Sequence, residues 1–121
     1  LSNSTFKGKN LNAKNVNDKG LSVGENSRGY IENLFFEKNR LAIAVKDGSN
    51  LSISKLDFLD NQFDVAVFKK KKEYESASLK IDNISDHKIS KIYLGKKNFI
   101  SSNHDLRINN VKNSYLNNIF Y

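Results

Sequence analysis

The residues best suited to chemistry in this sequence are a run of four lysines, an aromatic neighbour and a second lysine pair downstream. Brought together, they would present six ammonium groups to uronate, sulfate or phosphate groups, and the tyrosine ring could stack on a sugar face. The candidate polyanion-binding residues are Lys69, Lys70, Lys71, Lys72, Tyr74, Lys96 and Lys97. A lysine run on an inserted loop is also typical of a merely solvated segment, so this alternative stays open.

Nucleic acid is a disfavoured partner for these lysines. The chain has seventeen Lys but only three Arg, and no aromatic platform accompanies the charges. The formal net charge is +7, but richness in Lys, Asn, Ile and Ser is also typical of AT-rich coding. The net charge alone is therefore weak evidence for a polyanionic partner.

Sequence patterns for catalysis and metal binding are missing. The two histidines, His87 and His104, have no second imidazole or carboxylate at a metal-ligand spacing, and no common nucleophile, metalloprotease or phosphate-binding motif occurs. The chain has no Cys, which excludes disulfides and thiol chemistry. We therefore expect no cofactor, no metal and a role other than catalysis, although a site assembled from distant segments would escape this test.

The elements that must position the lysines are written as a repeat of 22 residues between Asp18 and Asn61. Laying residues 18–39 over residues 40–61 matches similar residue types at seven positions. The matching pairs are Leu21 with Ile43, Val23 with Val45, Ser27 with Ser49, Ile31 with Ile53, Leu34 with Leu56, Phe36 with Phe58 and Asn39 with Asn61. A fixed period of this size predicts a solenoid whose coils stack on one another.

The apolar spacing within one unit predicts strands rather than helices. Leu21 and Val23 lie two apart, and the alternation through Ile31, Leu34 and Phe36 is interrupted once, as at a bend. A unit of 22 residues is too short for a strand and a packed crossover helix, which together take about 30. Three short strands joined by bends fit this length, and they would form one turn of a parallel β-helix.

Later coils can be followed through apolar tetrads. First strands are expected at LSVG (21–24), IAVK (43–46), VAVF (65–68) and IYLG (92–95). The last tetrad is delayed by an insertion in KKKKEYESAS, whose polar content predicts a loop that bulges outward. We expect the later strand at Ile81 and Ile84 to recur at Ile108 and Val111, and Phe120 to begin a new first strand.

The two ends of the chain are expected to leave the stack of coils open. Residues 1–10 can be laid on the segment from Ile31, which puts Leu1 over Ile31 and Phe6 over Phe36, while residues 7–17 have no clear register. About four coils of ~22–27 residues then form one domain, 1–121. Open ends expose unpaired strands and apolar interior, so we expect the remainder of a longer chain, partner subunits or stacked copies to cap them.

Stacking in register also turns equivalent positions into columns. One column runs from Glu25 and Asp47 to Lys69 and Lys96. It predicts an exposed ion pair between Asp47 and Lys69, and a contact between Glu25 and Asp47 that is solvated or bridged by a cation. A calcium site would need more oxygen ligands than these two carboxylates supply.

Asparagine and serine columns are expected to be structural. Asn39 and Asn61, with Asn17 one period earlier, mark a bend where Asn tolerates left-handed backbone and can bond along a ladder. Ser27 and Ser49 show the same spacing at another bend. We assign these columns no binding role.

The segments DKGLSVGENS (18–27) and IAVKDGSNLSI (43–53), with tails ending in Asn39 and Asn61, resemble right-handed parallel β-helix repeats of the pectate-lyase-like class. They are more narrowly similar to repeats of poorly characterised bacterial extracellular proteins, some of which sit beside CotH-type domains. The resemblance implies an all-β, right-handed parallel β-helix and a secreted or cell-surface location. Polysaccharide lyases of this class use a Ca²⁺-binding Asp cluster with a catalytic Arg or Lys. Arg28, Arg40 and Arg107 lie outside the tetrads without such a cluster, so no catalytic residue is carried over.

Three functions are compatible with this architecture. The first is a non-catalytic structural or binding segment that contacts anionic polysaccharide. The second is the truncated core of a carbohydrate-active enzyme, a polysaccharide lyase or epimerase. The third is a trimeric phage or bacterial fibre segment. No run of about 18 apolar residues occurs, so no membrane span is expected.

Overall fold

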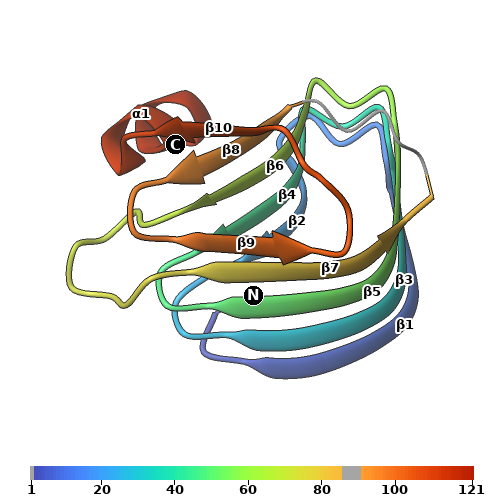
Figure 1. The fold of residues 1–121 in the computed structure, drawn as a ribbon, viewed down its shortest axis with the longest axis horizontal. Coiled ribbons are helices and arrows are strands. Elements are labelled where there is room, and N and C mark those ends of the chain that lie inside the picture. The colour runs from blue at the N-terminus through green and yellow to red at the C-terminus, as the bar shows by residue number, and fades with distance from the viewer. Residues whose placement is uncertain (1, 86–90) are drawn as a thin grey trace.

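The computed structural model describes residues 2–85 and 91–121, and it is a parallel β-solenoid of about four turns (Figure 1). The first sheet has the order β1-β3-β5-β7-β9 and the second β10-β8-β6-β4-β2, so the chain alternates between the sheets. The first sheet consists of β1 (Thr5–Lys14), β3 (Arg28–Glu37), β5 (Asn50–Leu59), β7 (Ser78–Ile84) and β9 (Phe99–Ser102). The second consists of β2 (Lys19–Val23), β4 (Leu41–Lys46), β6 (Phe63–Phe68), β8 (Ile92–Gly95) and β10 (Ile108–Val111), and α1 (Asn113–Phe120) follows.

Strand pairing confirms the predicted repeat. In the second sheet Leu21 lies beside Ile43, Ile43 beside Val65, and Val65 beside Ile92, all in parallel. The four predicted tetrads are therefore stacked strands. The insertion before Ile92 lengthens a loop and leaves the register of the sheet unchanged.

Each long strand of the first sheet combines two of the predicted short strands. In β5, Leu51 and Ile53 are buried, then Leu56 and Phe58, whereas the two residues between Ile53 and Leu56 are not. The strand therefore turns a corner there, and pairing with its neighbours continues on both sides of the corner. A turn of the solenoid thus has two strands, one of them bent, where three were expected. The ladder survives because every coil bends at the same position.

Stacked apolar columns fill the space between the sheets. Ile31, Ile53 and Ile81 are neighbours on successive strands and are almost completely buried. Phe36 and Phe58 stack with their ring centroids 6.1 Å apart and an interplanar angle of 24°. Burying a side chain of this size contributes about 1.5–3 kcal/mol, so these columns are the main stabilising element of each coil.

An asparagine ladder occupies the corner after the first-sheet strands. The Oδ1 of Asn39 accepts a hydrogen bond from the backbone N–H of Val16 at 3.0 Å, and the Oδ1 of Asn61 accepts one from the N–H of Asn39 at 3.0 Å. The Nδ2 of Asn39 donates to the carbonyl oxygen of Ala13 at 3.0 Å. The prediction is confirmed for Asn39 and Asn61, but Val16 rather than Asn17 occupies the earlier position.

The left-handed backbone at this corner falls on Lys38 and Asp60, the residues before the asparagines, with φ of 55° and 54°. A serine ladder lies at the other bend. The Oγ of Ser49 accepts a hydrogen bond from the N–H of Ser27 at 3.1 Å, and the Oγ of Ser27 accepts one from the N–H of Ser4 at 3.2 Å. Both ladders satisfy backbone N–H groups that would otherwise be left unpaired at the corners.

The predicted N-terminal register is wrong. β1 pairs with β3 at an offset of 23 residues, which places Gly8 beside Ile31 and Phe6 beside Gly29. Phe6 therefore does not lie over Phe36. Its ring fills the space left by Gly29, because a Cβ added to that glycine would lie 2.1 Å from the ring. Residues 7–14, for which the sequence offered no register, are part of this strand.

The C-terminal segment is a helix, and the prediction of a new first strand at Phe120 is wrong. α1 lies against the outer face of the second sheet, where Leu116 and Phe120 pack on buried residues that include Ala44 and Ala66 (Figure 1). The strands of this sheet are apolar on both faces, so the outer face also needs cover. The two alanines leave room for the helix.

Basic residues from the first coils bind the C-terminal end of α1. The Nζ of Lys19 donates to the carbonyl oxygen of Phe120 at 3.1 Å, and a guanidinium nitrogen of Arg40 donates to that of Ile119 at 3.0 Å. Cations at this end of a helix also interact favourably with its dipole. An eight-residue helix is about 12 Å long, so α1 spans two to three strand spacings of about 4.8 Å.

The last coil is shorter than predicted. Ile108 pairs with Ile92 of the second sheet, and Ser102 rather than Ile108 lies beside Ile81. The expected recurrence of Ile81 at Ile108 is therefore wrong, because β9 takes that place after only 21 residues.

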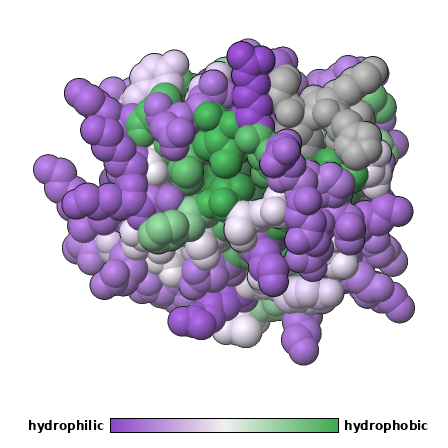
Figure 2. All heavy atoms as spheres, in the orientation of Figure 1, coloured by the Kyte–Doolittle hydropathy of each residue, from purple (hydrophilic) through white to green (hydrophobic). Residues whose placement is uncertain are grey.

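Both ends of the described stack expose part of the apolar interior. Figure 2 shows hydrophobic side chains gathered in the region between β9 and β10. The partly buried residues that pack against the core are Phe6, Ala13 and Leu21 in the first coil, and Leu94, Ile100, Leu106 and Ile108 in the last two coils.

Two sequence expectations, for Leu1 and His87, concern residues outside the described part of the chain. His104 lies in the loop after β9, and its Nε2 accepts a hydrogen bond from the N–H of Ile84 at 3.3 Å. This imidazole therefore has a structural contact between neighbouring coils.

Candidate anion-binding edge

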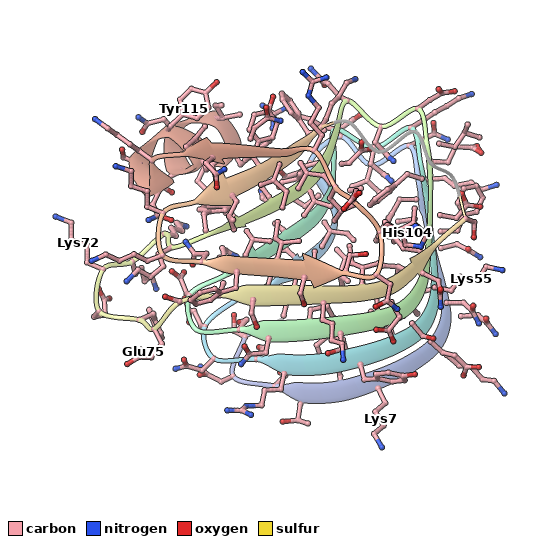
Figure 3. All side chains as sticks on the ribbon, viewed as in Figure 1. Lys7, Lys55, Lys72, Glu75, His104 and Tyr115 are labelled. Carbon is pink, nitrogen blue, oxygen red and sulfur yellow. The ribbon has the colours of Figure 1, made fainter. Side chains whose placement is uncertain are left out.

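The four predicted lysines lie in the loop between β6 and β7, residues 69–77, which projects from one edge of the solenoid (Figure 3). The equivalent turns after β2 and β4 have four and three residues (24–27 and 47–49), against nine in this loop. The outward bulge predicted from the sequence is therefore confirmed. Lys72 and Glu75 point away from the body of the protein.

Asp47 fixes the start of this loop. Its side chain is only 1% exposed, and its Oδ1 accepts hydrogen bonds from the backbone N–H groups of Lys70 at 2.7 Å and Lys71 at 2.9 Å. The N–H of Lys69 donates to Oδ1 of Asn113 at 2.8 Å. The predicted exposed ion pair between Asp47 and Lys69 is thus wrong. Asp47 is a buried carboxylate that binds loop backbone, and hydrogen bonds to charged acceptors of this kind are strong.

Lys71 provides the cation expected beside the acidic column. Its Nζ lies 2.7 Å from Oε1 of Glu25. The hydrogen bond and the charge of Lys71 lower the pKa of Glu25 below its ordinary 4.5. Glu25 in turn raises the pKa of Lys71 above 10.5, and the charge of Asp47 contributes to this shift. A lysine ammonium, rather than a metal ion, therefore balances Glu25 and Asp47.

We expect the pairing of Glu25 with Lys71 to stabilise the protein only within a window of pH. The lowered pKa of Glu25 means that the contribution is present above 4.5 and is lost as the pH falls through the folded-state pKa. The raised pKa of Lys71 means that it is present below 10.5 and is lost as the pH rises through that pKa. The difference in melting temperature between wild type and Glu25→Gln should therefore be larger at pH 7 than at pH 3.

Lys71→Gln and the double variant provide the control for this prediction. At pH 7 the two single losses should exceed additivity in a double-mutant cycle, and the coupling should disappear at pH 3. A coupling that is unchanged between pH 7 and pH 3 would contradict the assignment.

Lys70 belongs to a second cluster, around Tyr121. The Nζ atoms of Lys19, Lys70 and Lys46 lie 3.9, 4.2 and 5.0 Å from the centroid of the Tyr121 ring. Cations near an aromatic face are attracted to the ring quadrupole. The sequence gave no signal for this cluster, because its members come from three different coils and the segment after α1.

Three of the predicted lysines remain exposed. Lys72 lies on the loop, and Lys96 and Lys97 form the turn between β8 and β9. Within the described residues, none of the three forms a salt bridge. Pairing of β6 with β8 brings this turn next to the base of the loop, so the structure places all three on one edge. Tyr74 is half-buried, with its ring centroid 5.8 Å from the Nζ of Lys71.

Sequence reasoning missed one member of this edge, Lys112. The N–H of Lys96 donates to the carbonyl oxygen of Val111 at 3.1 Å, so Lys112 follows directly beside the turn. The short offset between β8 and β10 hid this neighbour, because the repeat predicted a longer coil.

Comparisons of the chain with protein-family models, with curated proteins and with solved structures found no match. Across residues 2–85 and 91–121, no group of three or more acidic or imidazole side chains is arranged to hold a metal ion. In the same residues no helix has the length and apolar character needed to cross a membrane.

Proposed function

We propose that this chain is a non-catalytic segment of a secreted or cell-surface bacterial protein of the right-handed, pectate-lyase-like β-helix class, and that it binds acidic polysaccharide. The observation that carries the proposal is the exposed edge formed by Lys72, Lys96 and Lys97, with Lys112 beside it. A linear polyanion has charges at regular intervals, and a straight solenoid edge presents several cations along one line. The partly exposed apolar ends would be covered by further coils or by partner subunits.

The anchored loop supports this assignment. Asp47 and Asn113 bind three successive backbone N–H groups at its start, from Lys69 to Lys71. Ordering a loop on binding costs free energy, so a loop that is already held contributes more to affinity. The anchor thus presents Lys72 at a fixed place beside the β8–β9 turn.

We expect the triple variant Lys72→Gln, Lys96→Gln, Lys97→Gln to bind immobilised polygalacturonate about tenfold more weakly than wild type. Exposed charge pairs contribute roughly 0.5 kcal/mol each, and about 1.4 kcal/mol corresponds to a factor of ten. Affinity of the wild type should also fall as salt is raised from low to physiological concentration. Biolayer interferometry at two salt concentrations measures both effects.

A matched control removes three charges from the other sheet. Lys7→Gln, Lys55→Gln, Lys80→Gln changes exposed lysines of β1, β5 and β7 that lie away from the loop (Figure 3). Equal losses in the two triple variants would show that net charge, and not the edge, drives binding. No binding by the wild type at low salt would refute the proposal, and release of unsaturated uronides would replace it with a lyase.

A further inference from the structure

A groove lies beside the last strand of the second sheet, between β10 and α1. It has a volume of about 730 Å³, within the range of about 300–1,000 Å³ typical of small-ligand sites. The residues that matter for its chemistry are Tyr93, Asn109, Asn110, Lys112 and Tyr115. The groove therefore combines aromatic, amide and cationic side chains, and it adjoins the exposed lysine edge.

Two tyrosines give the groove its aromatic surface. Tyr115 lies on α1, is 49% exposed and faces outward from the top of the molecule (Figure 3). Tyr93 lies on β8, and its ring packs against Phe63 with centroids 5.9 Å apart at 63°. Tyr93 is thus held rigidly in the sheet, whereas the ring of Tyr115 has an exposed surface. A rigid aromatic side chain supplies contact area with little loss of conformational entropy.

Two asparagines supply neutral polar groups. The Nδ2 of Asn109 donates to the carbonyl oxygen of Ile92 at 3.0 Å, which fixes the orientation of this amide and leaves its oxygen as an acceptor. The side chain of Asn110 is exposed and has no hydrogen bond to any residue that the structure describes. An amide is both donor and acceptor, and sugar hydroxyl groups need both.

The charge at the groove is positive. Lys112 lines it, and Lys96 lies beside Lys112 through the hydrogen bond from its N–H to Val111. Among the described residues that line the groove, none is acidic. A ligand that fills the groove and reaches the lysine edge should therefore be anionic.

We infer that the groove between β10 and α1 binds a short segment of acidic oligosaccharide, with one sugar ring stacked on Tyr115 and a carboxylate at Lys112. This inference rests on the proposed function and locates the sugar-contacting part of the same surface. The amides of Asn109 and Asn110 bind hydroxyl groups between these two contacts. Lys96 and Lys97 meet the next acidic group along the chain.

Tetragalacturonate is the probe for this site, titrated into the full chain by calorimetry and by amide NMR. Tyr115→Ala is expected to weaken binding about tenfold, as truncation of a central aromatic contact does, while Tyr115→Phe keeps the affinity of wild type. Tyr30→Ala is the matched control, because Tyr30 is 44% exposed but lies on β3 of the other sheet. The side-chain amide resonances of Asn109 and Asn110 should shift on titration.

The outcomes separate the groove from the edge. If the triple lysine variant loses affinity but Tyr115→Ala binds as wild type does, the edge stands and the groove inference is overturned. If the methyl ester of tetragalacturonate binds as tightly as the acid, the contact at Lys112 is refuted. If wild type sediments as a dimer and the amides of Asn109 and Asn110 do not shift, the groove takes a strand of a second copy instead. If wild type binds no acidic glycan, the proposed function fails as well.

Discussion

Asn39→Leu is expected to lower the free energy of unfolding by about 3 kcal/mol or more, because it removes hydrogen-bond partners from several groups at once. Asn39 is 2% exposed and bonds to the N–H of Val16, the carbonyl of Ala13 and Oδ1 of Asn61. Each buried polar group left without a partner costs about 1–3 kcal/mol. Leucine has a similar size, so the loss reports the polar contacts rather than a cavity. Urea denaturation followed by far-ultraviolet circular dichroism measures it.

Asn33→Leu is the control for this prediction. Asn33 also takes part in an amide pair, since its Nδ2 donates to Oδ1 of Asn10 at 3.1 Å, but this pair lies on the exposed outer face of the first sheet. Water can replace such a contact, so the loss should stay below about 1 kcal/mol. Similar losses for the two variants would contradict the importance assigned to the buried ladder.

Leu116→Ala is expected to cost about 2–5 kcal/mol, the range for truncating a fully buried leucine. Leu116 is completely buried between α1 and the second sheet. Its truncation weakens the cover over the outer face of β4 and β6. We therefore also expect earlier binding of a hydrophobic dye during denaturation and faster proteolytic cleavage within residues 113–121. Equilibrium denaturation and limited proteolysis measure these effects.

Asn118→Ala serves as the comparison, because Asn118 is exposed on the same helix. It should change stability by no more than about 0.5 kcal/mol. If Leu116→Ala destabilises no more than Asn118→Ala, the helix does not hold the sheet as described.

The central coils could be predicted from the sequence because the same residue type recurs at each buried position. Leu21, Ile43 and Val65 differ little in shape, and their fixed offset reveals the stacking directly. The first coil was misplaced because Gly8 occupies a position filled by Ile31 in the next coil. Without apolar side chains at these positions, a repeat has no pattern to align.

The helix left a signal that was overlooked. Leu116 and Phe120 are four apart, as on one face of a helix, and Ala44 and Ala66 with Phe68 made the second sheet apolar on its outer face too. A strand that is apolar on both faces needs cover on both. Reading these two patterns together would have predicted that the C-terminal segment packs on the sheet.

The candidate site was only partly accessible for a different reason. The lysine run and its loop were readable, but whether each ammonium group is exposed depends on partners far along the chain. Lys71 is held by Glu25, and Lys70 lies over the ring of Tyr121. Such contacts follow from tertiary packing, and no local spacing announces them.

The position of α1 changes how this molecule should come apart. Solenoids can lose coils singly from their ends, since each coil contacts only its neighbours. Here one end of α1 binds the loop of the third coil through Asn113, while the other binds Lys19 and Arg40 of the earliest coils. The helix acts as a brace, so neither end can fray until it lets go, and melting should be a single all-or-none event. Because residues 113–120 are synthesised after all ten strands, a newly made chain would gain this resistance to fraying only at the last moment.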